Sequence, residues 1–195
     1  MNKILLRYLG LALICIITFF AGNKAVADSA KKIKVYKHGF IVKVGDRAPD
    51  FKIDYVDKQS KSVKLSALRG SVVLLQFTAS WCGVCRSEMP ALEKEIWQRF
   101  KGKNFKLIGI DLKEPVAKIK AFITKTGVSY PLALDLKGNV FNLYARGGVT
   151  RNVLIDQSGK IVFLTRLYHK NEFKALINKI ETLLPSQACS KDGGC

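Results

Sequence analysis

Residues 72–100 read VVLLQFTASWCGVCRSEMPALEKEIWQRF, and this stretch decides the fold. The apolar run 72–77 predicts a strand that is buried on both faces. Residues 88–100 place apolar side chains at helical spacing, and Pro90 is expected to kink that helix. Two cysteines, three residues apart, stand between the run and the helix. The stretch therefore predicts a strand, a turn that carries a dithiol, and a helix.

The two cysteines of this turn predict redox chemistry. Cys82 begins the predicted helix, where unpaired amide hydrogens and the positive end of the helix dipole favour the thiolate. A thiolate attacks disulfides, and Cys85 is close enough in sequence to resolve the mixed disulfide that results. Half of a zinc site has the same spacing, so the pair alone does not establish the chemistry.

The order of the remaining apolar segments predicts an α/β fold, with a βαβ unit followed by a ββα unit. The central mixed sheet is expected to be flanked by helices, with an added N-terminal β-hairpin across 57–61. The expected strands are 52–56, 62–64, 72–77, 105–110, 132–134, 152–155 and 161–167. The expected helices are 66–70, 88–100, 115–125, 140–144 and 171–184, the last with Asn171 as its N-cap.

The first 27 residues are typical of a secretory signal. Lys3 and Arg7 supply the positive start, 8–20 form the apolar core, and a small-residue cleavage site ends at Ala27. Cleavage near Ala27 would make the protein periplasmic or otherwise extracytoplasmic. An N-terminal membrane anchor is the alternative, although the apolar run is shorter than the roughly 20 residues of a membrane span.

The rest of the chain divides into a basic lead-in at 28–43, one domain at 44–184 and a polar tail at 185–195. A domain of this length can bury a core without staples. Four cysteines remain after signal removal, and Cys189 and Cys195 lie in the tail. Those two form a local disulfide, stay as thiols, or exchange with the dithiol, and the sequence leaves these alternatives open.

The formal net charge is +18, and removal of Lys3, Arg7 and Lys24 with the signal leaves +15. The lysines are spread over the whole chain, and we find no nucleic-acid-binding module in it. We therefore interpret the charge as a solvated lysine surface, with no nucleic acid as partner. After export, an anionic membrane surface suits this charge better than nucleic acid does.

Several segments together carry a resemblance to a known family. They are 44–51 (VGDRAPDF), 81–90 (WCGVCRSEMP), 109–111 (GID), 154–156 (LID) and 158–160 (SGK). On these segments the chain resembles the TlpA/ResA-like thiol–disulfide oxidoreductases, which have a thioredoxin-like fold and belong to the superfamily that includes the AhpC/TSA peroxiredoxins. The resemblance extends over 44–184.

The resemblance implies an exported reductase of protein disulfides that works through a mixed disulfide. The implied partners are protein disulfide substrates and an upstream thiol reductant, either soluble or membrane-bound. No cofactor and no metal is expected, and the oligomeric state is left open. The direction of electron flow is also open, although the family is mostly reducing.

The resemblance also implies roles for residues around the dithiol. Cys82 is the attacking thiolate and Cys85 the resolving thiol, and Trp81 packs beside them as part of the docking surface. Glu88 stands where this family often has an acid, and it can accept the proton of Cys85. The alternative interpretation of Glu88 is a solvated acid in the first helical turns.

Three positions depart from the family pattern. Gln76 replaces a buried acid, Val84 replaces a proline, and Thr150 replaces a cis-proline that faces the dithiol. A cis bond before a residue other than proline costs about 2.5–4 kcal/mol, so a trans Val149–Thr150 bond is expected. The Thr150 hydroxyl is then expected to bond a sulfur or the substrate backbone, or else Thr150 merely starts the following strand.

Two alternative functions use the same cysteines. A peroxiredoxin-like peroxidase needs a threonine or serine three residues before its reactive cysteine, and Ala79 stands there. A copper or zinc carrier would use Cys82 and Cys85 as soft ligands, with His169 as a third. The close spacing of the cysteines suits disulfide exchange better than a carrier.

Overall fold

The computed structural model describes residues 34–57 and 59–184 of the 195-residue chain. The predicted signal, its cleavage site and the tail with Cys189 and Cys195 lie outside the described residues. Within the described ranges, no helix has both the length and the apolar character needed to cross a bilayer.

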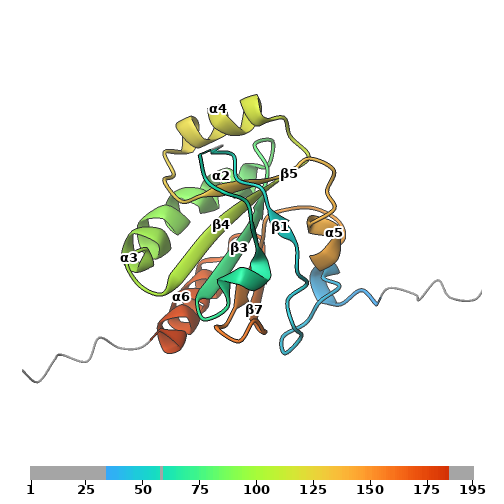
Figure 1. The fold of residues 1–195 in the computed structure, drawn as a ribbon, viewed down its shortest axis with the longest axis vertical. Coiled ribbons are helices and arrows are strands. Elements are labelled where there is room, and N and C mark those ends of the chain that lie inside the picture. Colours follow the sequence, from blue (N-terminus) through green and yellow to red (C-terminus); the bar gives the residue numbers. More distant parts are fainter. Residues whose placement is uncertain (1–33, 58, 185–195) are drawn as a thin grey trace, which may run out of the picture. The chain divides into compact units, whose positions relative to one another are not determined.

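A five-stranded sheet lies at the centre of the fold (Figure 1). Its strand order is β5-β4-β3-β6-β7, with β3, β4 and β5 parallel and with β6 and β7 antiparallel to their neighbours. The bounds are β3 Val72–Thr78, β4 Phe105–Leu112, β5 Leu132–Asp135, β6 Arg151–Ile155 and β7 Ile161–Arg166. The predicted mixed sheet is confirmed.

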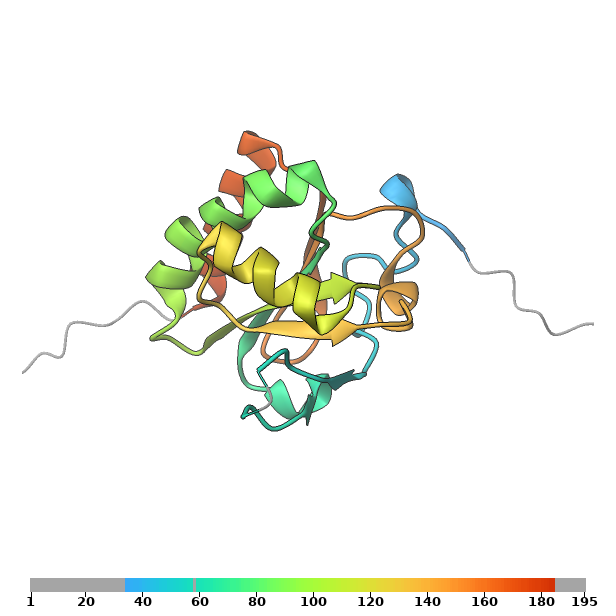
Figure 2. The same ribbon diagram turned by 90° about the horizontal axis from the view of Figure 1, so that it is seen from above.

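Helices cover both faces of the sheet (Figures 1 and 2). One face packs against α2, α4 and α6, and the other packs against α5 and the residues that precede β3. The bounds are η1 Lys37–Gly39, η2 Leu65–Leu68, α2 Gly83–Ala91, η3 Leu92–Trp97, α3 Gln98–Phe100, α4 Val116–Thr126, α5 Phe141–Tyr144 and α6 Lys170–Leu183.

Strand β3 shows why its apolar run is continuous. Val72 and Leu74 belong to the cluster under α2, α4 and α6, whereas Val73 and Leu75 belong to the cluster on the opposite face. Successive side chains of a strand point to opposite faces, and both faces are covered here. Gln76 continues the row of Leu74, so its side chain faces α2.

The N-terminal hairpin forms as predicted, but with shorter strands. Strands β1, Lys52–Ile53, and β2, Val63–Lys64, pair antiparallel in a sheet of their own. Phe40 and Val42, in the segment predicted to be a basic lead-in, are buried in the same cluster as residues of α5. The packed part of the chain thus begins before residue 44.

Two helix predictions change in detail. The irregularity expected at Pro90 takes the form of a π-helical segment, η3, directly after α2. Proline has no N–H for the helical ladder, and a π-turn accommodates such a gap. The predicted N-cap Asn171 is wrong, because α6 begins at Lys170 with His169 in the cap position. An edge-to-face contact between Tyr168 and Phe173, with ring centroids 5.2 Å apart, packs against this first turn.

Candidate active site

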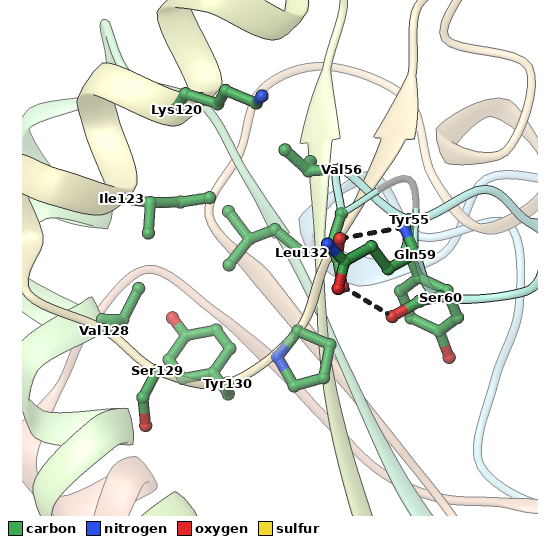
Figure 3. A pocket seen from close by; sticks show the side chains of 12 residues that line it. Tyr55, Val56, Gln59, Ser60, Lys120, Ile123, Val128, Ser129, Tyr130 and Leu132 are labelled. Carbon is green, nitrogen blue, oxygen red and sulfur yellow. Dashed lines mark hydrogen bonds between the residues drawn. The ribbon is translucent and has the colours of Figure 1, made fainter.

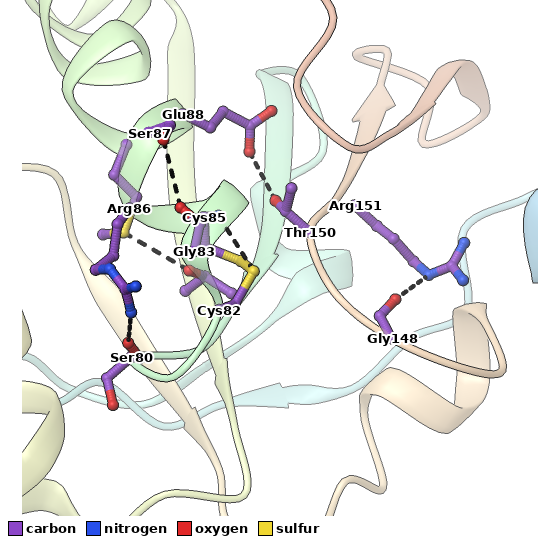
Figure 4. Close-up of a disulfide and its surroundings, with 12 residues drawn as sticks. Ser80, Cys82, Gly83, Cys85, Arg86, Ser87, Glu88, Gly148, Thr150 and Arg151 are labelled. Atoms are coloured by element: carbon purple, nitrogen blue, oxygen red, sulfur yellow. Dashed lines mark hydrogen bonds between the residues drawn. A yellow bond between two sulfur atoms is a disulfide. The ribbon is translucent and has the colours of Figure 1, made fainter.

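The dithiol lies at the N-terminus of α2, past the end of β3. Cys82 is the N-cap residue, and its Sγ accepts a hydrogen bond of 3.1 Å from the backbone N–H of Cys85. The two cysteines form a disulfide with their Cα atoms 5.3 Å apart (Figure 4). When the disulfide is reduced, the same N–H and the helix dipole stabilise a thiolate at Cys82.

The two sulfurs differ in their access to solvent. Cys82 is 7% exposed, whereas Cys85 is fully buried one turn into the helix. Ala79 belongs to the same small cluster, and the partly buried Val149 packs against it. The more exposed, capped position has the features of an attacking thiolate, and the buried one those of a resolving thiol.

The turn before the dithiol is fixed by hydrogen bonds from two sides. The Ser80 backbone N–H and hydroxyl donate to the Glu114 carboxylate at 2.5 and 2.6 Å, and Arg86 donates to the Ser80 carbonyl at 2.8 Å. Trp81 follows this anchored residue and is 61% exposed. A large aromatic side chain is thus presented to solvent directly beside Cys82.

Glu88 is buried, with only 1% of its surface exposed. It accepts hydrogen bonds from Thr150 at 2.6 Å, Asn152 at 2.7 Å and Gln76 at 3.1 Å. Burial raises the pKa of Glu88, and the three donors oppose that rise because they stabilise the charged form. The interpretation of Glu88 as a solvated acid is therefore wrong, since the side chain points into the sheet rather than to water.

A row of polar side chains across the sheet explains this network. Asn152 on β6 stands opposite Gln76 on β3, and Thr165 on β7 stands opposite Asn152. Gly109 is the partner of Gln76 on β4, and a β-carbon there would lie 3.3 Å from the Tyr130 ring. The missing side chain leaves room for the Tyr130 hydroxyl, which donates to Gln76 at 2.8 Å.

The segment at Thr150 corrects two expectations. The Val149–Thr150 bond is cis, not trans. The Thr150 hydroxyl donates to Glu88, so it bonds neither a sulfur nor a free substrate position (Figure 4). The trans bond was predicted from the local cost of the cis isomer alone. In the fold, Val149 packs against the disulfide cluster and Thr150 donates to a buried acid.

Arg151 anchors this segment, and the sequence analysis missed it. Its buried guanidinium donates to the carbonyls of Gly148, His38 and Arg146 at 2.9, 2.5 and 2.8 Å. It also lies 4.8 Å from the centroid of the Phe40 ring. Burial lowers the pKa of Arg151 to about 10. A charged residue at the start of an apolar strand is the signal that could have indicated this anchor.

Asp111 is a second buried acid near the turn. It pairs with Thr78 in the register of β3 and β4, and both of its carboxylate oxygens are buried without a hydrogen-bond partner among the described residues. Burial, together with the charge of nearby Glu114, raises the pKa of Asp111 to about 7. The sequence singled out Asp111 only as part of a family segment.

This geometry offers little support for the two alternative functions. The Ala79 side chain contacts the cysteines, so a methyl group stands where a peroxidase needs a hydroxyl. His169 caps α6. Among the residues that the structure describes, we find no group of three or more histidines, cysteines or acids arranged to hold a metal ion.

A sizeable cavity lies away from the dithiol, between α4 and the segment after β1 (Figure 3). It has a volume of 580 Å³ and is lined by Tyr55, Lys120 and Tyr130, among others. Asp57 shapes its rim by accepting hydrogen bonds from Gln59 and Ser60, both at 3.0 Å. It is linked to the site through Tyr130, which reaches Glu88 by way of Gln76.

Comparisons with known proteins agree with this geometry. The model of the AhpC/TSA family matches residues 44–164. The thiol-disulfide oxidoreductase ResA of Bacillus anthracis is 31% identical over 121 residues, which cover 62% of this chain and 68% of that protein. ResA of one Bacillus cereus strain is 28% identical over 162 residues, with coverage of 83% and 86%.

Solved structures extend the likeness to the fold. A proposed protein disulfide isomerase from Bacteroides thetaiotaomicron has a TM-score of 0.72 at 56% identity, with 75% of this chain and 92% of that chain covered. A proposed thiol:disulfide interchange protein DsbE from Chlorobium tepidum has a TM-score of 0.66 at 32% identity, with coverage of 73% and 98%. The chain belongs to the AhpC/TSA family, and within it to the ResA/TlpA-like thiol-disulfide oxidoreductases with a thioredoxin fold.

Proposed function

We propose that this oxidoreductase is an exported reductase of protein disulfides, in which Cys82 attacks and Cys85 resolves. The observation that carries the proposal is the capped and more exposed position of Cys82 beside the buried Cys85. An N-terminal segment with the features of a signal supports export. In this proposal the mature protein is extracytoplasmic after cleavage near Ala27, with an N-terminal anchor as the alternative.

The reaction proceeds by two exchanges. The Cys82 thiolate attacks one sulfur of the substrate disulfide, so that a mixed disulfide forms and the other substrate sulfur leaves as a thiolate. Cys85 then loses its proton and attacks Cys82 Sγ, which releases the second substrate thiolate. The enzyme ends as the Cys82–Cys85 disulfide, two electrons poorer, and an upstream thiol reductant restores the dithiol.

Glu88 is the proposed acceptor of the Cys85 proton. It lies three residues after Cys85 on α2, and positions three apart share one face of a helix. Burial raises the pKa of Glu88 toward the pKa of a thiol, and this favours proton transfer between Cys85 and Glu88. Gln76 cannot take this proton, because a side-chain amide donates and accepts hydrogen bonds but does not ionise.

Asn152 can complete the transfer. In the structure its amide nitrogen donates to Glu88 and to Thr165, while its Oδ1 is buried without a partner in the described part of the chain. A protonated Glu88 becomes a donor and needs an acceptor. Rotation of the Asn152 amide would present Oδ1 to that proton, so this orphaned oxygen suits the protonated state of the site.

Trp81 and the segment at Thr150 are the proposed contacts for substrate. Trp81 offers an exposed ring beside Cys82, and aromatic rings supply much of the energy of protein contacts. Val149 packs against the cluster that contains the disulfide, and Thr150 connects this segment to Glu88. A substrate peptide that reaches Cys82 would pass between these two features.

A trapping experiment tests the function. The variant Cys85→Ala should accumulate a covalent complex with a disulfide substrate through Cys82, and dithiothreitol should release it. Cys82→Ala serves as the control and should trap nothing, because Cys85 is buried. Trapping by Cys82→Ala but not by Cys85→Ala would reverse the assignment, and peroxide consumption that outruns disulfide reduction would favour the peroxidase.

A further inference from the structure

A second hollow in the surface adjoins the turn that carries the dithiol. Its volume is 360 Å³, and Trp81 and Ser80 line one side while residues of α4 line the other. Phe122 and Ala121 supply apolar surface from α4. The hollow is therefore next to Cys82 in the chain and open to a substrate that reaches that sulfur. We call it the basic hollow because three of its lining residues are cations.

Three cations line the basic hollow, namely Arg86 from α2 and Lys118 and Lys125 from α4. Lys118 and Lys125 are seven residues apart, which places them on one face of the helix, with Phe122 between them. None of the three forms an ion pair with any acid in the ranges that the structure describes. Their charges are thus available to a ligand.

The single acid of the hollow is already occupied. Glu114 is 4% exposed and accepts both the backbone N–H and the hydroxyl of Ser80. These two bonds orient its carboxylate toward Ser80, and its one negative charge stands against the three cations of the lining. The net field inside the hollow is therefore positive.

Arg86 connects the hollow to the dithiol. Its guanidinium donates to the Ser80 carbonyl, and its Nη2 would lie 3.7 Å from a β-carbon added at Gly83 between the two cysteines. The backbone N–H of Arg86 donates to the Cys82 carbonyl at 3.2 Å. A positive charge that lines the hollow therefore lies beside the turn that carries the attacking sulfur, where Arg86 reaches Ser80 (Figure 4).

We propose that the basic hollow docks an acidic segment of the substrate protein, with one or two Asp or Glu side chains near the target cysteine. This proposal rests on the proposed reductase function and narrows its substrate class. The cations attract the carboxylates, while Trp81 and Phe122 take up the apolar part of the segment. The volume is at the small end of the range for ligand sites and suits side chains rather than a flat membrane.

The test uses two disulfide-bonded peptides that differ only in the residues flanking one cysteine, two Glu in one and two Gln in the other. Single-turnover oxidation of the reduced enzyme is followed with each peptide. The intact enzyme should react about tenfold faster with the Glu peptide, and the preference should shrink in about 0.5 M salt. The variant K118E/K125E should lose or invert the preference, measured as the ratio of its rates with the two peptides.

The matched control is K103E/K106E, which carries the same change in net charge. Lys106 lies near the start of β4, whereas the dithiol lies past the far end of the parallel strand β3, so the altered charge is remote from the hollow. The control should keep the preference for the Glu peptide. Equal loss in both variants would show a general effect of charge and overturn the hollow as a site.

Three further results would contradict the proposal or the function on which it rests. An intact enzyme that reacts equally fast with both peptides has no acidic preference, although its activity would still support the reductase function. If neither peptide oxidises the reduced enzyme, the result would instead contradict the reductase function itself. Binding of vesicles of anionic phospholipid that depends on Lys118 and Lys125, without any preference between peptides, would assign the hollow to a membrane surface.

Discussion

Two buried carboxyl groups lie close to the dithiol turn, and they have opposite surroundings. Glu88 receives hydrogen bonds from three side chains on β3, β6 and the segment before β6. Asp111 receives none among the described residues, and it faces the charge of Glu114. Both are almost without exposure to solvent. The two acids are therefore equally buried but differ in the hydrogen bonds that they receive.

The comparison separates the effect of burial on the pKa of these acids from the effect of hydrogen-bond donors. Burial raises the pKa of both groups, because it penalises the charged form. Donors then stabilise the Glu88 carboxylate, so this group can exist in both states next to Cys85. Asp111 has no such donors among the described residues, and the charge of Glu114 raises its pKa further. We assign proton transfer to the first and a pH-dependent cost of folding to the second.

The largest expected effect concerns the stability of the oxidised protein and Asp111. The pKa of Asp111 rises from 3.8 to about 7, so between these values the unfolded chain gives up a proton that the folded chain keeps. Stability contributed by this group therefore falls as the pH rises, by up to about 4 kcal/mol. Asp111→Asn should stabilise the protein relative to the parent at pH 8, with little difference at pH 4.

Urea unfolding of both proteins at several pH values measures this difference. Glu88→Gln sharpens the comparison, since three hydrogen bonds offset part of the burial cost and its pH-dependent difference should be smaller than that of Asp111→Asn. A stability difference for Asp111→Asn that does not change with pH would show that Asp111 does not titrate in this interval.

The next effect concerns Asn152, one of the donors to Glu88. Asn152→Leu keeps the approximate volume but removes the bonds to Glu88 and Thr165. It should destabilise the protein by about 1–3 kcal/mol at a pH where the Glu88 carboxylate is charged, and by less at a lower pH where Glu88 is protonated. Thr165→Val is the control, because it removes the bond to Asn152 alone, and its smaller cost should not depend on pH.

The smallest effect concerns the hydroxyl of Thr150. Thr150→Val removes one hydrogen bond to Glu88, worth about 1 kcal/mol, and should raise the pKa of Glu88 further. Thr150→Ser retains the hydroxyl and should leave that pKa unchanged. A carbon-13 NMR titration of the Glu88 carboxyl in the oxidised protein gives the value in each variant. The same pKa in the Val and Ser variants would mean that the bond has no effect on Glu88.

Much of this arrangement was predictable from local sequence. The dithiol at a helix start, the buried strand before it and the mixed sheet follow from periodicity, turn residues and the spacing of Cys82 and Cys85. Gln76 was noted only as the replacement of a buried acid in the family pattern. The polar network that a buried amide requires was therefore not predicted.

The members of that network could not be predicted. Asn152 meets Gln76 only because β6 pairs with β3 in one register, and Tyr130 reaches Gln76 only because Gly109 lacks a side chain. A register depends on contacts distant in sequence. For the same reason the isomer at Thr150 was predicted wrongly, since its environment comes from α2 and from Arg151.

The central claim, that Glu88 takes the proton of Cys85, is tested most directly by the reaction of the reduced protein with Ellman's reagent in stopped flow. Attack by Cys82 releases one thionitrobenzoate, and attack by Cys85 on the adduct releases a second, so one trace resolves both steps. Glu88→Gln should leave the first phase within about twofold and slow the second by about 100-fold at pH 7, whereas Asp111→Asn should change neither by more than about threefold. A second phase that is as fast in Glu88→Gln as in the parent, from pH 5 to 9, would contradict the account.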